Sequence, residues 1–171
     1  MKHHPPEMGA EPGWTEIDQH RAPLNRRFVS ADADPKRFRV RYWKDADGNL
    51  AAKVLFGPNC EGPPGHAHGG SLASVLDEAM GGNSWLHGHA ALAGTLTIKY
   101  RAPFPLETVA TVTSKIERVE GRKVFTSGAI RSADGTLHAE GEGIFVVMRE
   151  DVQQMLAAEA RKDGRAFGDA Y

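Results

Sequence analysis

The stretch GPPGHAHGGSLASVLDEAMGG, residues 62–82, decides how the rest of this sequence is interpreted. Prolines interrupt regular structure at its start, and no residue between Ser71 and Met80 breaks a helix. Its apolar residues cover more than the usual ~100° stripe of an amphipathic helix. We therefore predict a helix that begins near Gly69 and is mostly enclosed by the rest of the fold.

Two acidic residues in the middle of this helix need an explanation. Asp77 and Glu78 point about 100° apart around the helix axis, so one at most faces solvent easily. An enclosed carboxyl group without a basic neighbour has a raised pKa or a functional partner. Both acids could instead lie at the helix rim, solvated or paired with a strand Arg or Lys. The sequence leaves both interpretations open.

The start of the helix carries a second pattern, His68, Gly69 and Gly70. Glycines here leave the first backbone N–H groups unshielded, so that these groups can donate to a polarised carbonyl or an oxyanion. The glycines could also serve only to let helix and sheet pack closely. Gly69 and Asp77 are separated by about 12 Å along a helix. Both can act on one carbonyl only if they come from two subunits related by a two-fold axis.

The flanking residues predict an antiparallel sheet. Residues 38–44 and 50–56, joined by DADGN, have the pattern of a hairpin. Four long strand-like segments follow the helix and predict an antiparallel meander over residues 92–102, 107–119, 124–133 and 137–148. Small residues on one face of the last segment, Ala139, Gly141 and Gly143, predict close approach of the helix. The fold class is α+β, a curved antiparallel sheet wrapped around one long central helix.

Length and composition bound the organisation of the chain. The 171 residues suit one domain, which we place at residues 38–148, between an irregular arm (1–37) and a C-terminal surface helix and tail (149–171). We expect little core from residues 1–25. The formal net charge of -1 does not favour a nucleic-acid partner.

The compartment follows from cysteine content and apolar runs. A single cysteine, Cys60, suits a reducing compartment. No apolar run approaches the ~18 residues of a membrane span, and the N-terminus lacks the apolar core of a signal peptide. We expect a cytoplasmic protein without membrane insertion.

In this order, GPPGHAHGGSLASVLDEAMG, LTIKYRAPFPLETV and EGRK resemble the hotdog-fold acyl-CoA thioesterases of the 4-hydroxybenzoyl-CoA and phenylacetate-pathway type. Within this family the likeness is greatest to the thioesterase superfamily member 4-like group, and it covers residues 38–148. The resemblance implies a homodimer or homotetramer that hydrolyses acyl-CoA thioesters without a cofactor. The alternative is a hotdog protein that binds acyl-CoA without turning it over.

The resemblance also implies roles for single residues. Asp77 falls at the catalytic carboxylate, as nucleophile or as base for water. Gly69 falls at the amide that polarises the thioester carbonyl, between His68 and Gly70 of the same motif.

Two positions depart from the family pattern. Gly62 stands where many relatives have Asn, and Ala93 stands where relatives have a Ser or Thr hydroxyl that holds water. Thr95, two residues further and therefore expected on the same strand face as Ala93, is the expected substitute.

Coenzyme A is a large polyanion, which a nearly neutral chain must meet with local cations. We expect these cations to be Lys99, Arg101, Arg122 and Lys123, although each could equally be an ordinary solvated charge. The acyl group would lie in an apolar slot between helix and sheet, with Trp85 and Met80 limiting its length.

Other chemistries fit the sequence less well. Four histidines bracket the helix and could in principle bind zinc, namely His66, His68, His87 and His89. Cys60 near His66 suggests a Cys–His nucleophile. Neither pattern matches a known spacing. The sequence has no GxSxG motif, which argues against a serine hydrolase. A hotdog dehydratase or hydratase would need a histidine and an acid in a different arrangement.

Overall fold

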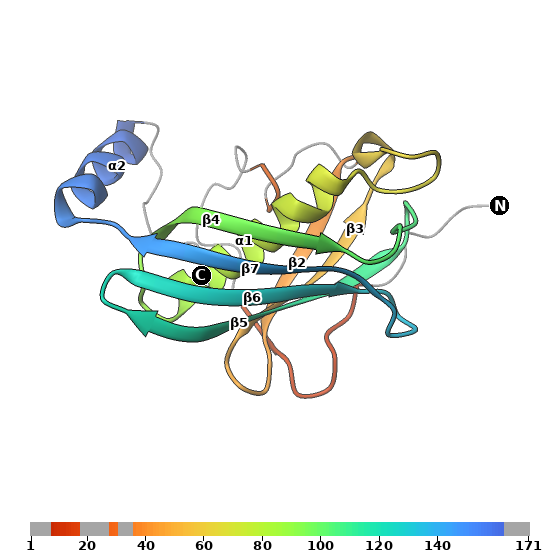
Figure 1. Ribbon diagram of the computed structural model, residues 1–171, viewed down its shortest axis with the longest axis horizontal. Coiled ribbons are helices and arrows are strands. Elements are labelled where there is room, and N and C mark those ends of the chain that lie inside the picture. The colour runs from red at the N-terminus through yellow and green to blue at the C-terminus, as the bar shows by residue number, and fades with distance from the viewer. Residues whose placement is uncertain (1–7, 18–27, 31–35, 163–171) are drawn as a thin grey trace.

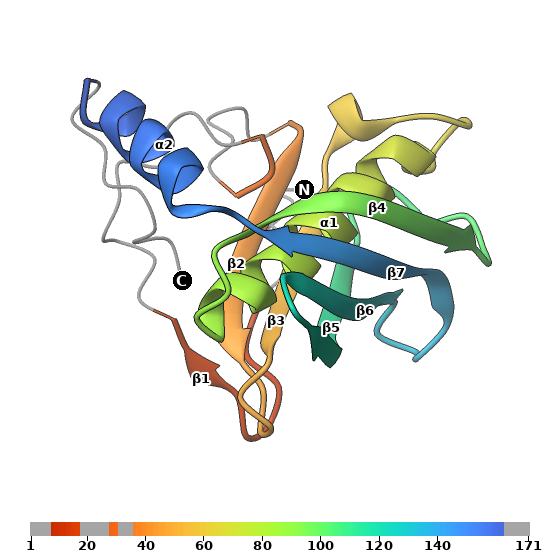
Figure 2. The same cartoon turned by 60° about the vertical axis from the view of Figure 1, so that its left-hand side comes forward.

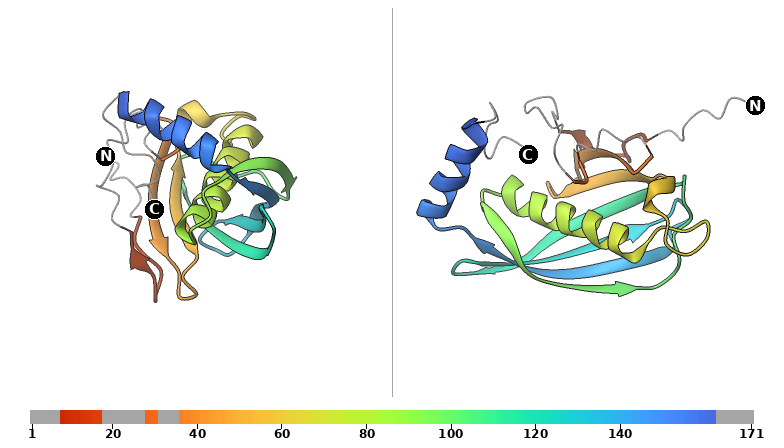
Figure 3. Two further views of the ribbon diagram at one scale, coloured as in Figure 1. Left: turned by 90° about the vertical axis from the view of Figure 1, so that its left-hand side faces the viewer. Right: turned by 90° about the horizontal axis from the view of Figure 1, so that it is seen from above.

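A computed structural model describes residues 8–17, 28–30 and 36–162 of the chain. A seven-stranded antiparallel sheet curves around helix α1 (Gly69–Leu86), as Figure 1 and the end-on view in Figure 3 show. The strands are β1 (Thr15–Glu16), β2 (Phe38–Lys44), β3 (Leu50–Phe56), β4 (Ala91–Tyr100), β5 (Val109–Glu120), β6 (Lys123–Arg131) and β7 (Leu137–Val147). The predicted α+β architecture and the helix start near Gly69 are confirmed.

The predicted hairpin is the pair β2–β3, in register from Phe38 opposite Phe56 to Lys44 opposite Leu50. Its turn is held by Asp45, whose carboxylate accepts hydrogen bonds from the backbone N–H groups of Asp47 and Asn49. Such local side-chain to backbone bonds are what favour Asp at turns. This turn ends next to the helix, because the Asn83 side chain accepts a hydrogen bond from the Leu50 N–H.

The core lies between α1 and the inner face of the sheet. The helix buries one side there through Leu72, Val75, Leu76, Ala79 and Met80. The predicted close approach is confirmed at Gly141, where a Cβ would lie 3.2 Å from the Met80 side chain. It is wrong at Gly143, where a Cβ would meet Phe145 and Thr126 of the sheet itself.

The strand order corrects the predicted meander. Strands β5, β6 and β7 are consecutive neighbours, but β4 pairs with β7 and forms the far edge of the sheet. The segment between β4 and β5 contains two prolines and is drawn to the loop before α1. There Phe104 O accepts from Ala67 N at 2.8 Å, and Leu106 N donates to Gly65 O at 3.0 Å. A segment held in this way crosses the fold and cannot form a tight hairpin.

The N-terminal arm contributes more than expected. Ile17 is buried in the core cluster, and the Trp14 ring lies 5.7 Å from the Trp43 ring. Strand β1 pairs with β2 and so covers that edge of the sheet (Figure 2). The expectation that residues 1–25 add little core is therefore wrong for Ile17. The rest of the arm that was expected to be irregular lies mainly outside the described residues.

The C-terminal helix is confirmed as a surface element. Helix α2 (Glu150–Lys162) has no buried residue and projects away from the sheet (Figures 1 and 2). The predicted tail beyond it lies outside the described residues. No helix in the described ranges is both long and apolar enough to cross a membrane.

Candidate active site

The loop before α1 determines which backbone amides are open at the helix start. His68 is the N-cap, with an extended backbone, and its Nδ1 accepts a hydrogen bond from Gly70 N at 2.9 Å. Its carbonyl accepts from Ser71 N and Leu72 N. Among the described residues, the Gly69 N–H has no acceptor. The first turn therefore presents one unoccupied donor, at the residue where the sequence predicts an oxyanion donor.

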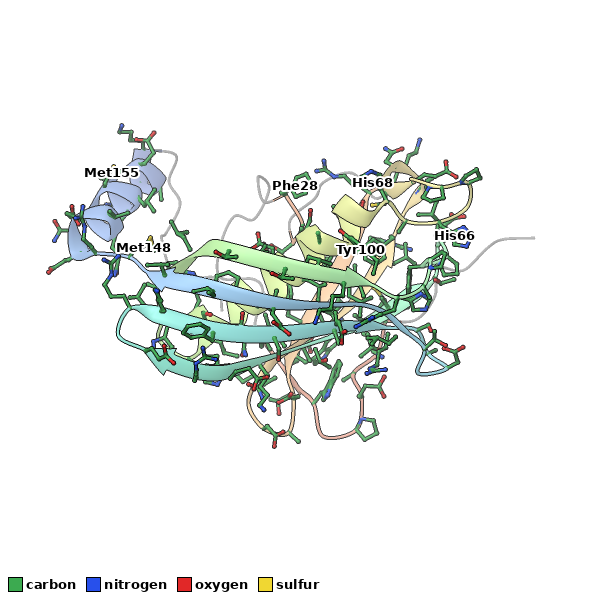
Figure 4. The ribbon with its side chains drawn as sticks, in the orientation of Figure 1. Phe28, His66, His68, Tyr100, Met148 and Met155 are labelled. Atoms are coloured by element: carbon green, nitrogen blue, oxygen red, sulfur yellow. The ribbon has the colours of Figure 1, made fainter. Side chains whose placement is uncertain are left out.

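Tyr100, at the end of β4, lies against this same turn (Figure 4). Its hydroxyl donates to Gly69 O at 3.0 Å, and its ring lies 3.2 Å from where a Cβ on residue 69 would stand. Sequence reasoning missed this residue. A signal was present, since Tyr100 ends the row begun by Leu96 and Ile98 on the face of β4 that looks toward the helix.

Asp77 lies on the side of α1 that faces β4 and β7. Gly81, one turn later, would meet the Phe145 ring with a Cβ at 3.0 Å, and Trp85, two turns later, donates from Nε1 to Ala91 O at 2.9 Å. Residues four apart share a helix face, so the Asp77 carboxyl is directed beside the edge strand. It is partly buried rather than enclosed.

Burial raises the pKa of the Asp77 carboxyl above 3.8, and the nearby negative charge of Glu78 raises that pKa further. No basic group contributes to this shift. Asp77 therefore lies between the two interpretations open from sequence, as a partly buried acid whose pKa is not lowered by a basic group. A partly desolvated carboxylate without a cation is a stronger base than one in water.

The pKa of Asp77 gives a first prediction. If the ionised carboxylate acts in the reaction, kcat/KM should fall with decreasing pH, with a midpoint above 3.8. Replacing Glu78 with glutamine removes one cause of the raised pKa, so the midpoint should move to lower pH. The check is a pH–rate profile of both proteins with one acyl-CoA substrate. Identical midpoints in the two proteins would contradict this role for Asp77.

Gly69 and Asp77 are eight residues apart on one helix, so they cannot hold one carbonyl together within a chain. The edge of β4 beside them is open, since β7 is the only strand that pairs with β4 in the described sheet. An open edge strand is a template for pairing with another chain. Within one chain, Gly69 and Asp77 therefore do not form one site.

The expected role of Thr95 is corrected by a β-bulge. Ala93 pairs with Phe145, and Thr95 pairs with the adjacent Ile144, because the register shifts between them at Gly94. Neighbouring residues of β7 point to opposite faces, so Thr95 points to the outer face of the sheet and Ala93 to the helix side. Thr95 cannot replace the missing hydroxyl at Ala93.

The four predicted cations do not form one patch within the chain. Lys99 and Arg101 lie on the outer face at one end of β4, near Glu142 and Glu140 respectively. Arg122 and Lys123 lie at the other end, where Lys123 is opposite Val146. The two pairs are offset by six positions along β7, from Glu140 to Val146, which is about 20 Å.

Two cavities, of about 400 and 420 Å³, lie along the outer face of the sheet. Lys99 lines the first and Thr95 the second, together with polar strand residues. Neither cavity is lined by Gly69, Asp77 or Trp85. Neither cavity therefore reaches the predicted acyl slot between helix and sheet, where Met80 is fully buried and Trp85 links the end of α1 to β4.

The geometry argues against the two alternative chemistries. The histidine pairs lie at opposite ends of α1, about 27 Å apart, and no group of described residues could hold a metal ion. Cys60 is buried and directs its Sγ to Arg37 O, while His66 Nδ1 faces Pro64 O. Each of these two side chains is thus directed at a backbone carbonyl and not at the other.

Comparison with known proteins agrees with the fold. Residues 64–139 match the family model described as the thioesterase superfamily. The acyl-coenzyme A thioesterase THEM4 of Xenopus laevis is 38% identical over 106 residues, which are 61% of this chain and 48% of that protein. The chain spans about half the length of the curated relatives it matches.

Two solved structures are also similar to this chain. A thioesterase superfamily protein is 38% identical and superposes with a TM-score of 0.60, over 63% of this chain and 53% of that chain. A protein from Bacillus halodurans, solved with CoA, is 28% identical with a TM-score of 0.55, over 60% of this chain and 69% of that chain. The matched segment of 64–139 contains Gly69, Asp77 and the edge strand.

Proposed function

Because this chain belongs to the thioesterase superfamily, we propose that it hydrolyses an acyl-CoA thioester to a free acid and coenzyme A. One observation carries the proposal. The unoccupied Gly69 amide and the partly buried Asp77 carboxyl lie on one helix, beside an edge strand that is open to a second copy. A hydrogen-bond donor to the oxyanion and a basic carboxylate are two groups that promote hydrolysis of an acyl compound.

The proposed reaction consumes one water molecule. The thioester carbonyl oxygen accepts a hydrogen bond from the Gly69 N–H. Asp77 either removes a proton from the attacking water or adds to the carbonyl carbon itself. The negative charge that develops on the oxygen is stabilised at Gly69. The C–S bond then breaks, and the thiolate of coenzyme A leaves and takes up a proton. If water attacked, the acid is formed in this step; if Asp77 attacked, water then hydrolyses the anhydride between the acyl group and Asp77, which releases the acid and restores the carboxylate.

The site requires two chains, so we propose that a homodimer is the active unit. Antiparallel pairing of β4 with β4 of a second copy extends both sheets into one and sets the two α1 helices antiparallel. Gly69 of one chain then approaches the middle of the other helix, where Asp77 of the second copy lies. Pairing of two such dimers into a homotetramer is compatible with this arrangement.

The same pairing supports the predicted coenzyme A contacts. In an antiparallel β4 pair, Lys99 and Arg101 lie beside the Ala91 end of the second copy. Lys123 of that copy is about three strand spacings, ~14 Å, from them. Cations that are separated within a chain thereby gather on one outer surface, where the phosphates of coenzyme A would bind. Arg122 is held nearby by donating from Nε to Val147 O at 2.9 Å.

The remaining parts of the proposal follow the sequence analysis. Residues 38–148 are the thioesterase domain, and the protein works without a cofactor. Cys60 is the one cysteine of the sequence and so forms no disulfide within it, which supports a reducing, cytoplasmic location.

Thiol release tests the proposed function. Acetyl-, hexanoyl-, palmitoyl-, phenylacetyl- and 4-hydroxybenzoyl-CoA are incubated with the purified protein, and free coenzyme A is measured. We expect saturable, enzyme-dependent release from at least one of them. Saturable binding without release would support the non-catalytic acyl-CoA-binding alternative, and neither binding nor release would contradict both functions.

A further inference from the structure

One peptide unit at the start of α1 is held at both of its ends. Its N–H, on Gly70, donates to His68 Nδ1 at 2.9 Å, and its carbonyl, on Gly69, accepts from the Tyr100 hydroxyl at 3.0 Å. His68 comes from the loop before the helix, and Tyr100 comes from the end of β4 (Figure 4). Two segments far apart in the sequence therefore fix the same peptide plane.

This restraint acts where the backbone is otherwise least restricted. Gly69 and Gly70 are consecutive glycines, and glycine has the widest choice of backbone conformation. A donor that stabilises an oxyanion is effective when its direction is set before the reaction. The Gly69 N–H belongs to the preceding peptide unit, whose carbonyl on His68 accepts from Ser71 N and Leu72 N. With the peptide units on both sides of the Gly69 Cα held, the φ and ψ angles of Gly69 and the direction of its N–H are fixed. The Tyr100 ring lies 3.2 Å from where a Cβ on residue 69 would stand, so it limits movement of this backbone further.

We propose that Tyr100 is a positioning residue, which aims the open Gly69 amide at the substrate carbonyl by holding Gly69 O and packing against the Gly69 backbone. This inference rests on the thioesterase function proposed above. Tyr100 acts through Gly69 and does not itself contact the reacting atoms. His68 performs the same task from the other end, by occupying the Gly70 N–H, so that only the Gly69 N–H is left open.

The exposure of Tyr100 separates this role from a purely structural one. The side chain is 54% exposed, so its hydroxyl would be well satisfied by water alone. Removing that hydroxyl therefore leaves the core of the single chain intact, and the oligomeric state of the variant is checked in parallel because Tyr100 lies on the strand proposed to pair. An effect on turnover without an effect on stability is the signature of positioning.

The test is Tyr100→Phe, which keeps the ring and removes the hydroxyl. We expect kcat to fall about 5- to 50-fold. KM should change by less than about threefold, because the Tyr100 hydroxyl makes no contact with the bound substrate. The thermal midpoint should stay within about 2 °C of the wild type. Thr108→Val, which removes an exposed hydroxyl that likewise donates to a backbone carbonyl, that of Pro105, is the matched control and should keep wild-type rates.

A second readout does not depend on activity. In amide NMR, Tyr100→Phe should increase the fast motion of the Gly69 and Gly70 N–H groups and speed their hydrogen exchange. Unchanged glycine dynamics, or a kcat within twofold of the wild type, would overturn the proposal. If the wild-type protein hydrolyses no acyl-CoA, the proposed function fails separately, and the NMR comparison alone then decides whether Tyr100 holds this peptide.

Discussion

Replacing Asp77 with asparagine should lower acyl-CoA turnover by about two orders of magnitude or more, because the amide is neither a base nor a nucleophile. The geometry of the helix is retained, since the two side chains are nearly the same size. The measurement is thiol release at saturating substrate, with the oligomeric state checked in parallel. Glu78→Gln is the matched control on the next position and should keep activity within about tenfold at neutral pH.

The stability of Asp77→Asn distinguishes loss of chemistry from loss of fold. Burial and Glu78 raise the pKa of Asp77 in the folded chain above its ordinary value of 3.8. A carboxyl group whose folded pKa is raised favours folding less as the pH rises from that ordinary value through the folded pKa. Asparagine has no such ionisation. At neutral pH the variant should therefore unfold at the same or a higher temperature than the wild type, and a marked drop in that temperature would make its inactivity uninformative.

Replacing Gly69 with valine should have a comparable effect on turnover. A Cβ at residue 69 would lie 3.2 Å from the Tyr100 ring, so that ring must shift by at least a few tenths of an ångström. The two methyl groups would also cover the open amide. Loss of one oxyanion donor typically lowers kcat by ~10²–10³. We expect a fall of about that size in steady-state thiol release.

A glycine in open space provides the control for this variant. A Cβ added at Gly9 would meet no described atom within 4 Å, and this residue lies on the N-terminal arm, outside α1. Gly9→Val should therefore hydrolyse substrate at the wild-type rate. Full activity of Gly69→Val would contradict the role of this amide, whatever the behaviour of the control.

Local signals in the sequence were sufficient to predict the central helix and the strands. They were not sufficient to predict which strands lie next to each other. The helix was predictable because apolar residues surround it, and the hairpin because DADGN has a strong turn pattern. The place of β4 at the sheet edge was not predictable, since strand patterns do not specify which strands pair. It depends on backbone bonds between the loop at Gly65–Ala67 and the segment at Phe104–Leu106.

The same distinction holds for the candidate site, where features set by local sequence were predictable and features set by distant contacts were not. The open amide at Gly69 follows from consecutive glycines at a helix start, which sequence alone reveals. Thr95 was misplaced because alternation along a strand assumes no bulge, and the bulge at Gly94 reverses the face. Tyr100 was missed because its contact with Gly69 joins residues 31 positions apart.

The central claim is that Gly69 of one chain and Asp77 of another act on the same thioester. The most direct measurement mixes the two inactive variants, Asp77→Asn and Gly69→Val, under conditions in which subunits exchange. About half of the dimers should then be mixed, and each mixed dimer contains one intact site and one doubly altered site. We predict recovery of about 25% of wild-type thiol release. No recovery, with mixed dimers shown by affinity tags, would contradict a site shared between two subunits.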